Sequence, residues 1–212
     1  MRTAIFGAVL LLASCASLPA QPAQSLRSVN GPDCQNAPAP EASNPASDQS
    51  EPERYEKFGE LANLVGKCFK GTPTEDSPEK VEDIQYWAWA LGGTAITIEH
   101  AFTDGSYGGI SYVYPKSGSD AFTYVYITNA GFHTQGTITL SDDQSFTATE
   151  TVTGHPTITE VRSITTYDEY GITSMTSDFF DDGEWQPGPG FTHEATTDPF
   201  PHLRSWQAPA ED

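Results

Sequence analysis

Basic residues are scarce in this 212-residue chain, which has 10 Lys and Arg against 29 Asp and Glu. The formal net charge is −19. A nucleic-acid surface needs clustered Lys and Arg to neutralise phosphates, so this composition excludes a nucleic-acid partner. The same charge favours solubility and is repelled by anionic lipid head groups. Composition leaves the protein partners unknown.

Several motifs that would indicate a reaction or a metal are also missing. Gly-x-Ser-x-Gly does not occur, and no glycine-rich loop opens a helix to hold a phosphate. The acidic stretch SDFFDDGEW, residues 177–185, lacks the alternating carboxylates of an EF-hand. Neither His-x-His nor His-x-x-x-His is present, so a metal or haem site is disfavoured. We expect no metal and no cofactor, and no catalytic residue is identified.

No apolar run is long enough to span a bilayer comfortably, and the clearest one is IFGAVLLLA, residues 5–13. It follows Arg2 and precedes small residues and Cys15. This arrangement resembles the bacterial lipoprotein signal. The resemblance implies a signal peptide over 1–14, a lipid on Cys15, and, because Ala16 follows, an outer-membrane anchor facing the periplasm. An ordinary secretory signal or an uncleaved hydrophobic end are the alternatives.

Three cysteines occur in the chain. If Cys15 carries lipid, Cys34 and Cys68 remain as a pair. An oxidising envelope compartment allows a disulfide between them. Two free thiols are the other interpretation, and the sequence does not decide between the two.

The N-terminal third contains a tether and one helix. Residues 15–50 have few large apolar side chains, which predicts a disordered tether behind the lipid. Ser50 and Glu53 form a capping-box pattern, and apolar residues from Tyr55 to Val65 then follow at helical spacing. We expect this helix to plug or flank a domain over residues 51–200, with a flexible tail over 201–212.

The remaining pattern has a period of two, typical of β-strands. Short turn sequences separate about ten such segments, so neighbours in sequence are expected to pair antiparallel. The prediction is an all-β fold: one closed up-and-down barrel preceded by one short helix, with a two-sheet sandwich as the alternative. The expected strands are 65–71, 81–91, 94–103, 107–115, 121–129, 131–140, 145–154, 158–167, 172–180 and 191–197.

Four stretches together resemble a calycin-like, or lipocalin-like, family of small bacterial barrels of unassigned function. The resemblance implies a fold but no reaction, so it assigns no catalytic residue. The stretches are LVGKCFKGT, YWAWALGGTAITIEHAFTDGSYGG, TNAGFHTQGTITL and VTGHPTITEVRS.

Alternation along three strands places an ionisable group among apolar side chains. His100 shares a face with Ile98 and Phe102, while Glu150 and Arg162 occupy similar positions on adjacent strands. We expect Glu150 and Arg162 to form an ion pair inside the barrel, or to lie at the floor of a ligand cavity. A one-residue register error would instead expose all three.

The other histidines are expected to be more peripheral. His133 lies on a polar strand face, either outside or toward a wet lumen, whereas His155, His193 and His202 are expected at the surface. Dense aromatic residues between 86 and 126 indicate either core packing or a pocket. The candidate ligand contacts are His100, Phe102, Tyr124, Tyr126, His133, Glu150 and Arg162.

The sequence thus predicts a lipid-anchored envelope barrel that binds a small, largely apolar ligand. Two other functions remain open. The first is a barrel enzyme that uses His and Glu for acid–base chemistry. The second is a non-catalytic interaction protein with a filled core.

Overall fold

The computed structural model describes residues 33–35 and 56–203. The predicted signal peptide, Cys15, most of the predicted tether and residues 204–212 lie outside the described residues. A 3₁₀ helix, η1 (Gly59–Leu64), precedes ten strands, and a short 3₁₀ turn, η2 (Leu91–Gly93), joins β2 to β3. The strands are β1 (Cys68–Pro73), β2 (Asp83–Ala90), β3 (Ala95–Phe102), β4 (Gly108–Pro115), β5 (Phe122–Thr128), β6 (His133–Ser141), β7 (Ser145–Thr153), β8 (Ile158–Tyr167), β9 (Ile172–Asp181) and β10 (Glu184–Ala195).

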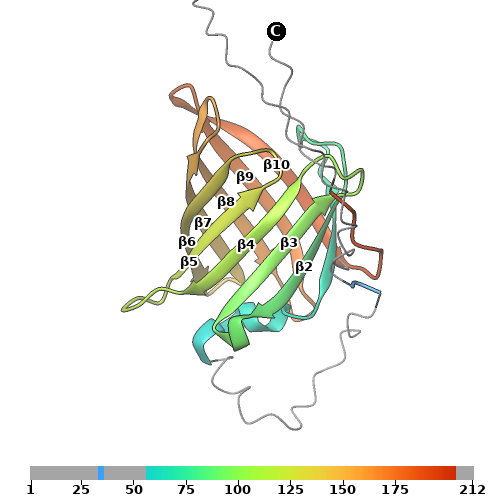
Figure 1. Ribbon diagram of the computed structural model, residues 1–212, viewed down its shortest axis with the longest axis vertical. Helices are drawn as coiled ribbons and strands as arrows, with labels where there is room; N and C mark the ends of the chain where they lie inside the picture. The colour runs from blue at the N-terminus through green and yellow to red at the C-terminus, as the bar shows by residue number, and fades with distance from the viewer. Residues whose placement is uncertain (1–32, 36–55, 204–212) are drawn as a thin grey trace, which may run out of the picture.

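All ten strands form one closed antiparallel barrel (Figure 1). Each strand pairs with its neighbours in sequence, and β1 closes the barrel by pairing with β10, as in the register of Phe69 with Ala195. Closure leaves no unpaired strand edge that another chain could extend. The predicted up-and-down barrel is therefore confirmed, and the sandwich alternative is wrong.

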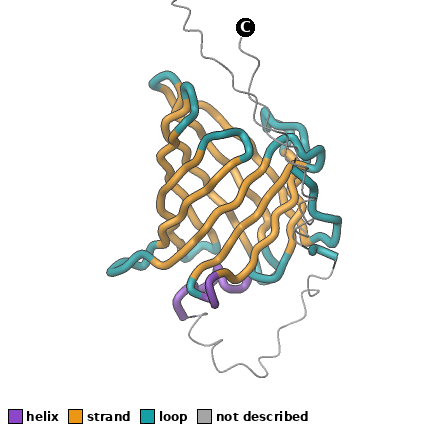
Figure 2. Tube along the Cα trace, in the orientation of Figure 1, coloured by secondary structure: helices purple, strands orange, loops and turns teal. Residues whose placement is uncertain are grey.

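One end of the barrel is closed by η1, which lies across it in Figure 2. Phe58, Leu61 and Leu64 are buried there against inward-facing side chains of the strands. The Phe58 ring stacks on Phe122 with 5.8 Å between centroids. The helix forms because apolar side chains recur at helical spacing, and Gly59 at φ +52° interrupts its regularity.

Strand β10 begins earlier than the sequence pattern predicts, at Glu184 instead of residue 191. The segment Pro187–Gly190 has the composition of a turn, which conceals the strand. The structure accommodates it through a register shift between Pro187 and Gly190 against β9. Irregular pairing of this kind is where proline is tolerated in a sheet.

Cys34 and Cys68 form a disulfide that attaches residues 33–35 to the start of β1. Both cysteines are buried with Ile84, and Tyr86 and Phe200 pack against them. The sequence left open whether these cysteines are bonded or are two free thiols, and the structure shows that they are bonded. Within residues 33–35 and 56–203, no helix is long and apolar enough to cross a membrane.

Candidate functional site

A cavity of about 620 Å³ occupies the barrel interior. Its volume lies within the range of about 300–1,000 Å³ that is usual for small-molecule sites. The end away from η1 is lined by residues of the connecting loops, including Ser106, Phe132 and His155. The interior is therefore not filled by side chains.

Apolar side chains supply most of the cavity wall, and a smaller polar set lies among them. The apolar wall includes Trp87, Ile98, Phe102, Ile138, Phe146, Val152, Val161, Met175, Phe179 and Phe191. The polar set includes Glu79, Asp83, Gln85, His100, Tyr107, Ser111, Tyr124, Tyr126, Thr134, Glu150, Ser163, Thr165 and Ser177.

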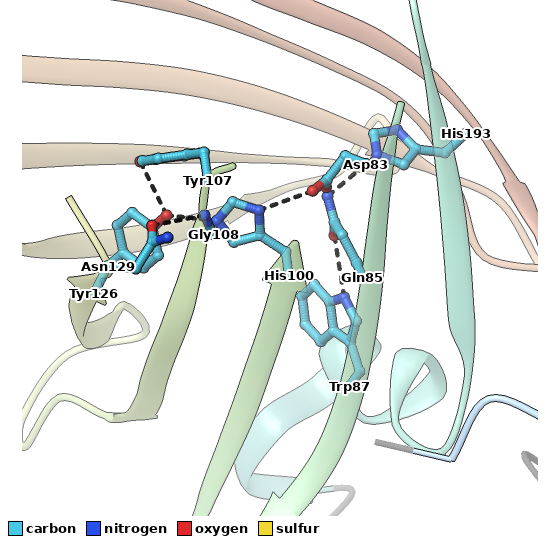
Figure 3. A network of polar contacts seen from close by, with 9 residues as sticks. All are labelled: Asp83, Gln85, Trp87, His100, Tyr107, Gly108, Tyr126, Asn129 and His193. Carbon is cyan, nitrogen blue, oxygen red and sulfur yellow. Dashed lines mark hydrogen bonds and ion pairs between the residues drawn. The ribbon is translucent and has the colours of Figure 1, made fainter. Parts of the chain in front are cut away.

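His100 is the centre of a polar chain that crosses the cavity wall (Figure 3). Its Nδ1 atom lies 2.9 Å from Oδ1 of Asp83, and its Nε2 atom lies 2.5 Å from the hydroxyl of Tyr126. The Tyr126 hydroxyl donates to the Tyr107 hydroxyl at 3.0 Å. Strands β2, β3 and β5 and the β3–β4 loop thus each place one polar group in the same chain.

Asp83 is only 4% exposed, and its Oδ1 atom is within hydrogen-bond distance of Nδ1 of His100. The other ring nitrogen, Nε2, is within hydrogen-bond distance of the Tyr126 hydroxyl, which in turn donates to the Tyr107 hydroxyl. His100 therefore joins a buried carboxyl to two tyrosine hydroxyls of the cavity wall.

Gly109 makes the contact between His100 and Tyr126 possible. In the sheet it lies opposite His100, between β3 and β5. A Cβ atom at residue 109 would lie 2.2 Å from the backbone oxygen of Ile127 and 2.6 Å from the Tyr126 ring. The missing side chain therefore lets the Tyr126 ring cross β4 and reach His100.

Glu150 on β7 belongs to a second polar group beside the first. The Thr134 hydroxyl donates to Oε2 of Glu150, and Tyr124 also hydrogen-bonds to this carboxyl. Burial raises the pKa of Glu150, and these two hydroxyl donors lower it in part. Glu150 is thus a half-buried carboxyl whose hydrogen-bond donors are neutral hydroxyl groups.

The cavity tyrosines are held in their neutral, donating form. Burial raises the pKa of Tyr107 to about 12, and the charges of Glu150 and Asp83 act in the same direction. Burial also raises the pKa of Tyr124 and Tyr126 well above the usual value. All three therefore present hydroxyl groups, and no phenolate, at neutral pH.

His193 on β10 contributes a third polar contact at the edge of the first network. Its Nε2 atom lies 3.2 Å from Nε2 of Gln85 (Figure 3). The Oε1 atom of the same Gln85 side chain accepts a hydrogen bond from Nε1 of Trp87. His193 reaches β2 across Gly71, where a Cβ atom would lie 2.8 Å from the His193 ring. Burial lowers the pKa of His193 to about 4, so the ring is neutral at pH 7.

The structure brings most of the predicted ligand contacts to the cavity wall, namely His100, Phe102, Tyr124, Tyr126 and Glu150. His133 does not join them. It is exposed on the outer face of β6, because Thr134 takes the inward position. The expectation that His193 lies at the surface is wrong, since its ring is largely buried in β10. His155 is half-buried in the turn between β7 and β8, where it also lines the cavity.

Arg162 is also on the outer face, so the expected ion pair with Glu150 is wrong. Its Nε atom donates to Asp178 at 2.8 Å, and its guanidinium lies 4.3 Å from the Trp185 ring centroid. A β-bulge explains the error. Ile158 pairs with Asp181 and Glu160 pairs with Phe180, so β8 has one extra residue there relative to β9. Beyond this bulge, the residues of β8 that counting by two places inside the barrel point outward instead.

Several cavity residues were not predicted from the sequence: Asp83, Gln85, Tyr107 and Thr134. Alternation with Trp87 on β2 is a signal that would have found Asp83 and Gln85. Within the described residues, no cluster of three or more His, Cys, Asp or Glu side chains has the arrangement of a metal site.

The fold and the site together define a closed ten-stranded antiparallel barrel with an internal, mostly apolar cavity. Among solved structures, the chain is similar to the crystal structure of Rv2717c from M. tuberculosis. The TM-score is 0.50 at 14% identity, over 66% of this chain and 96% of that chain. At this identity the likeness shows the fold alone. No protein-family model and no curated protein matches the chain.

Proposed function

We propose that this protein is a lipid-anchored cell-envelope protein of the calycin-like type that binds a small, largely apolar ligand inside its barrel. The observation that carries the proposal is the cavity of about 620 Å³, with apolar walls and a few ordered polar groups. Such a combination is typical of ligand sites, where apolar contact supplies affinity and polar groups set orientation.

The arrangement of His100 favours binding over acid–base catalysis. Both of its ring nitrogens are engaged, Nδ1 with Asp83 and Nε2 with Tyr126. A general base needs a free nitrogen within hydrogen-bond reach of the substrate proton. His100 would have to break the bond to Tyr126 first, so we assign it to positioning the Tyr126 and Tyr107 hydroxyls toward a ligand.

The anchor is supported by the sequence around Cys15, which lies outside the described residues. By this proposal the mature chain begins at Cys15, carries lipid there and is held at the outer membrane on its periplasmic side. Expression of the full chain in a bacterium with an alkyne-labelled fatty acid tests it. The wild-type chain should be labelled and sediment with membranes, and Cys15→Ser should be neither labelled nor sedimented.

Ligand binding is tested with the neutral apolar fluorophore N-phenyl-1-naphthylamine. Ser163 faces the cavity, so Ser163→Phe should fill part of it and weaken binding by about ten-fold, equivalent to roughly 1.4 kcal/mol. Ile164 is the next residue on the same strand and is 51% exposed. Ile164→Phe adds a ring on the outside and should leave the affinity unchanged.

Native mass spectrometry of the envelope-purified protein supplies the second measurement. A co-purified mass that is retained by wild type and Ile164→Phe but lost from Ser163→Phe would identify the ligand. Failure of the fluorophore to bind, or equal binding by both variants, would exclude the cavity as the site.

A further inference from the structure

We propose that the cavity selects ligands that carry a basic nitrogen on an apolar body, with the Glu150 carboxylate receiving the ammonium group. This inference rests on the proposed ligand-binding function and adds the chemical class of the ligand.

The charge of the cavity wall is one-sided. Among the described residues that line it there is no Lys and no Arg, whereas three carboxyl groups do so: Glu79, Asp83 and Glu150. The histidines in the same wall are His100 and His155. A carboxylate ligand would have no Lys or Arg in this wall to pair with, whereas an ammonium ligand would lie close to carboxyl groups that attract it.

Two of the three carboxyls already have partners that account for them. Asp83 is bonded to His100 at 2.9 Å. Glu79 lies in the β1–β2 loop and accepts the backbone N–H groups of Lys80 and Val81 at 2.7 and 2.8 Å. These two carboxyls are therefore satisfied without a ligand.

Glu150 differs because its hydrogen-bond partners are neutral and its carboxyl is half-buried at the cavity wall. It accepts hydrogen bonds from Thr134 on β6 and Tyr124 on β5. Arg162, the cation on the adjacent strand, is outside the barrel with Asp178. Partial removal of a carboxylate from water without a counter-charge is unfavourable, and an ammonium group at Glu150 would offset that penalty.

The groups around Glu150 suit an ammonium head on an apolar body. Tyr107 and Tyr126 lie within electrostatic range of Glu150, so a cation near these hydroxyls is attracted by that carboxyl. Aromatic faces also attract cations, by about 0.5–2 kcal/mol. The apolar side chains of the remaining wall, such as Phe146 and Val152, would contact the body of the ligand.

Proton balance gives the site a pH dependence. When Glu150 is protonated in the free protein, binding of an ammonium ligand releases that proton to solvent and leaves an ammonium–carboxylate pair. The titratable groups that face this region are Tyr124, Tyr126, Tyr107, the Asp83–His100 pair and His155. Because several ionisable groups face the same region, the comparison between variants and not the pH profile alone assigns the effect to Glu150.

Three probes with one ring system test the inference: 2-(1-naphthyl)ethylamine, 2-(1-naphthyl)ethanol and 1-naphthylacetate, titrated by calorimetry at pH 7.5. Wild type should bind the amine about ten-fold tighter than the alcohol and the carboxylate most weakly. Glu150→Gln keeps an acceptor for Thr134 and Tyr124 but removes the charge. It should abolish the preference for the amine and leave the affinity for the alcohol within about two-fold.

Glu160→Gln is the matched control, because Glu160 is an exposed carboxyl on the next strand. It removes the same charge from the outside and should keep the preference for the amine. Equal binding of amine and alcohol by wild type, or equal behaviour of the two Gln variants, would overturn the inference while leaving ligand binding intact. Absence of binding by all three probes would overturn the proposed function itself. The wild-type ratio decides the question even if a variant does not fold.

Discussion

Nδ1 of His100 lies 2.9 Å from Oδ1 of Asp83, across two adjacent strands inside the barrel. On the outer wall, Nε of Arg162 lies 2.8 Å from Oδ2 of Asp178, again across adjacent strands. The two distances are nearly equal, but the inner carboxylate is 5% exposed and the outer one 38%. Their contributions to stability should therefore differ, because water screens the outer pair.

Asp83→Ala should lower the free energy of unfolding by about 2–3 kcal/mol, since it leaves the His100 ring without its acceptor in a buried site. Asp178→Ala should lower it by about 0–1 kcal/mol. Urea denaturation of the two variants at pH 7 measures both. Equal losses would mean that the inner pair is as well solvated as the outer one.

Glu150→Gln should stabilise the ligand-free protein at neutral pH. The pKa of Glu150 in the folded state is raised by burial above its ordinary value of 4.5. The carboxyl thus favours the folded state when protonated, and this contribution is lost as the pH rises above 4.5 through the folded-state pKa. The variant should be more stable than wild type at pH 7 and lose this advantage near pH 4. Urea denaturation at both pH values tests it, and a constant difference would contradict it.

The pKa of His193 predicts that its contribution to stability depends on pH in the opposite direction to that of Glu150. The His193 pKa is lowered from 6.5 to about 4 by burial, so the neutral ring favours the folded state above pH 6.5 and this stability is lost as the pH falls toward 4. Between pH 7 and pH 5 the wild-type protein should lose roughly 1–2 kcal/mol through this group. His193→Gln, which keeps a polar group beside Gln85, should lose less over the same interval. Chemical denaturation at the two pH values compares them, and His202→Gln, at an exposed position, is the control.

Removal of the disulfide should destabilise the barrel. Cys34 and Cys68 are 34 residues apart, and the bond restricts the unfolded chain over that loop. Cys34→Ser should lower the free energy of unfolding by about 2–4 kcal/mol, and a reducing agent should have the same effect on wild type but none on the variant. Cys15→Ser leaves the bond intact and should unfold like wild type.

The barrel could be predicted from the sequence because its strands alternate regularly and their turns are short. That alternation also placed His100, Phe102 and Glu150 on the correct face. Each of these residues lies on a strand without a bulge before it, so counting by two holds along the whole segment.

The rest of the site depends on features that do not appear in a single strand. One extra residue between Ile158 and Glu160 reversed the faces of β8 and placed Arg162 outside. The contact of His100 with Tyr126 depends on Gly109, a residue on a third strand, so only the register across β3, β4 and β5 reveals it. His193 lies within the strand predicted over 191–197, but its approach to Gln85 depends on the missing side chain of Gly71 on β1, so only the register across β10, β1 and β2 reveals it.

The disulfide has a consequence for proteolysis. Residues 34 to 68 and the sulfur bridge form a covalent ring, so a single cut between residues 35 and 67 opens the ring without separating the two pieces. If Cys15 carries lipid, a protease that nicks this stretch would leave the barrel at the membrane. Release would need both the cut and reduction of the bridge, whereas a single cut between Cys15 and Cys34 would suffice.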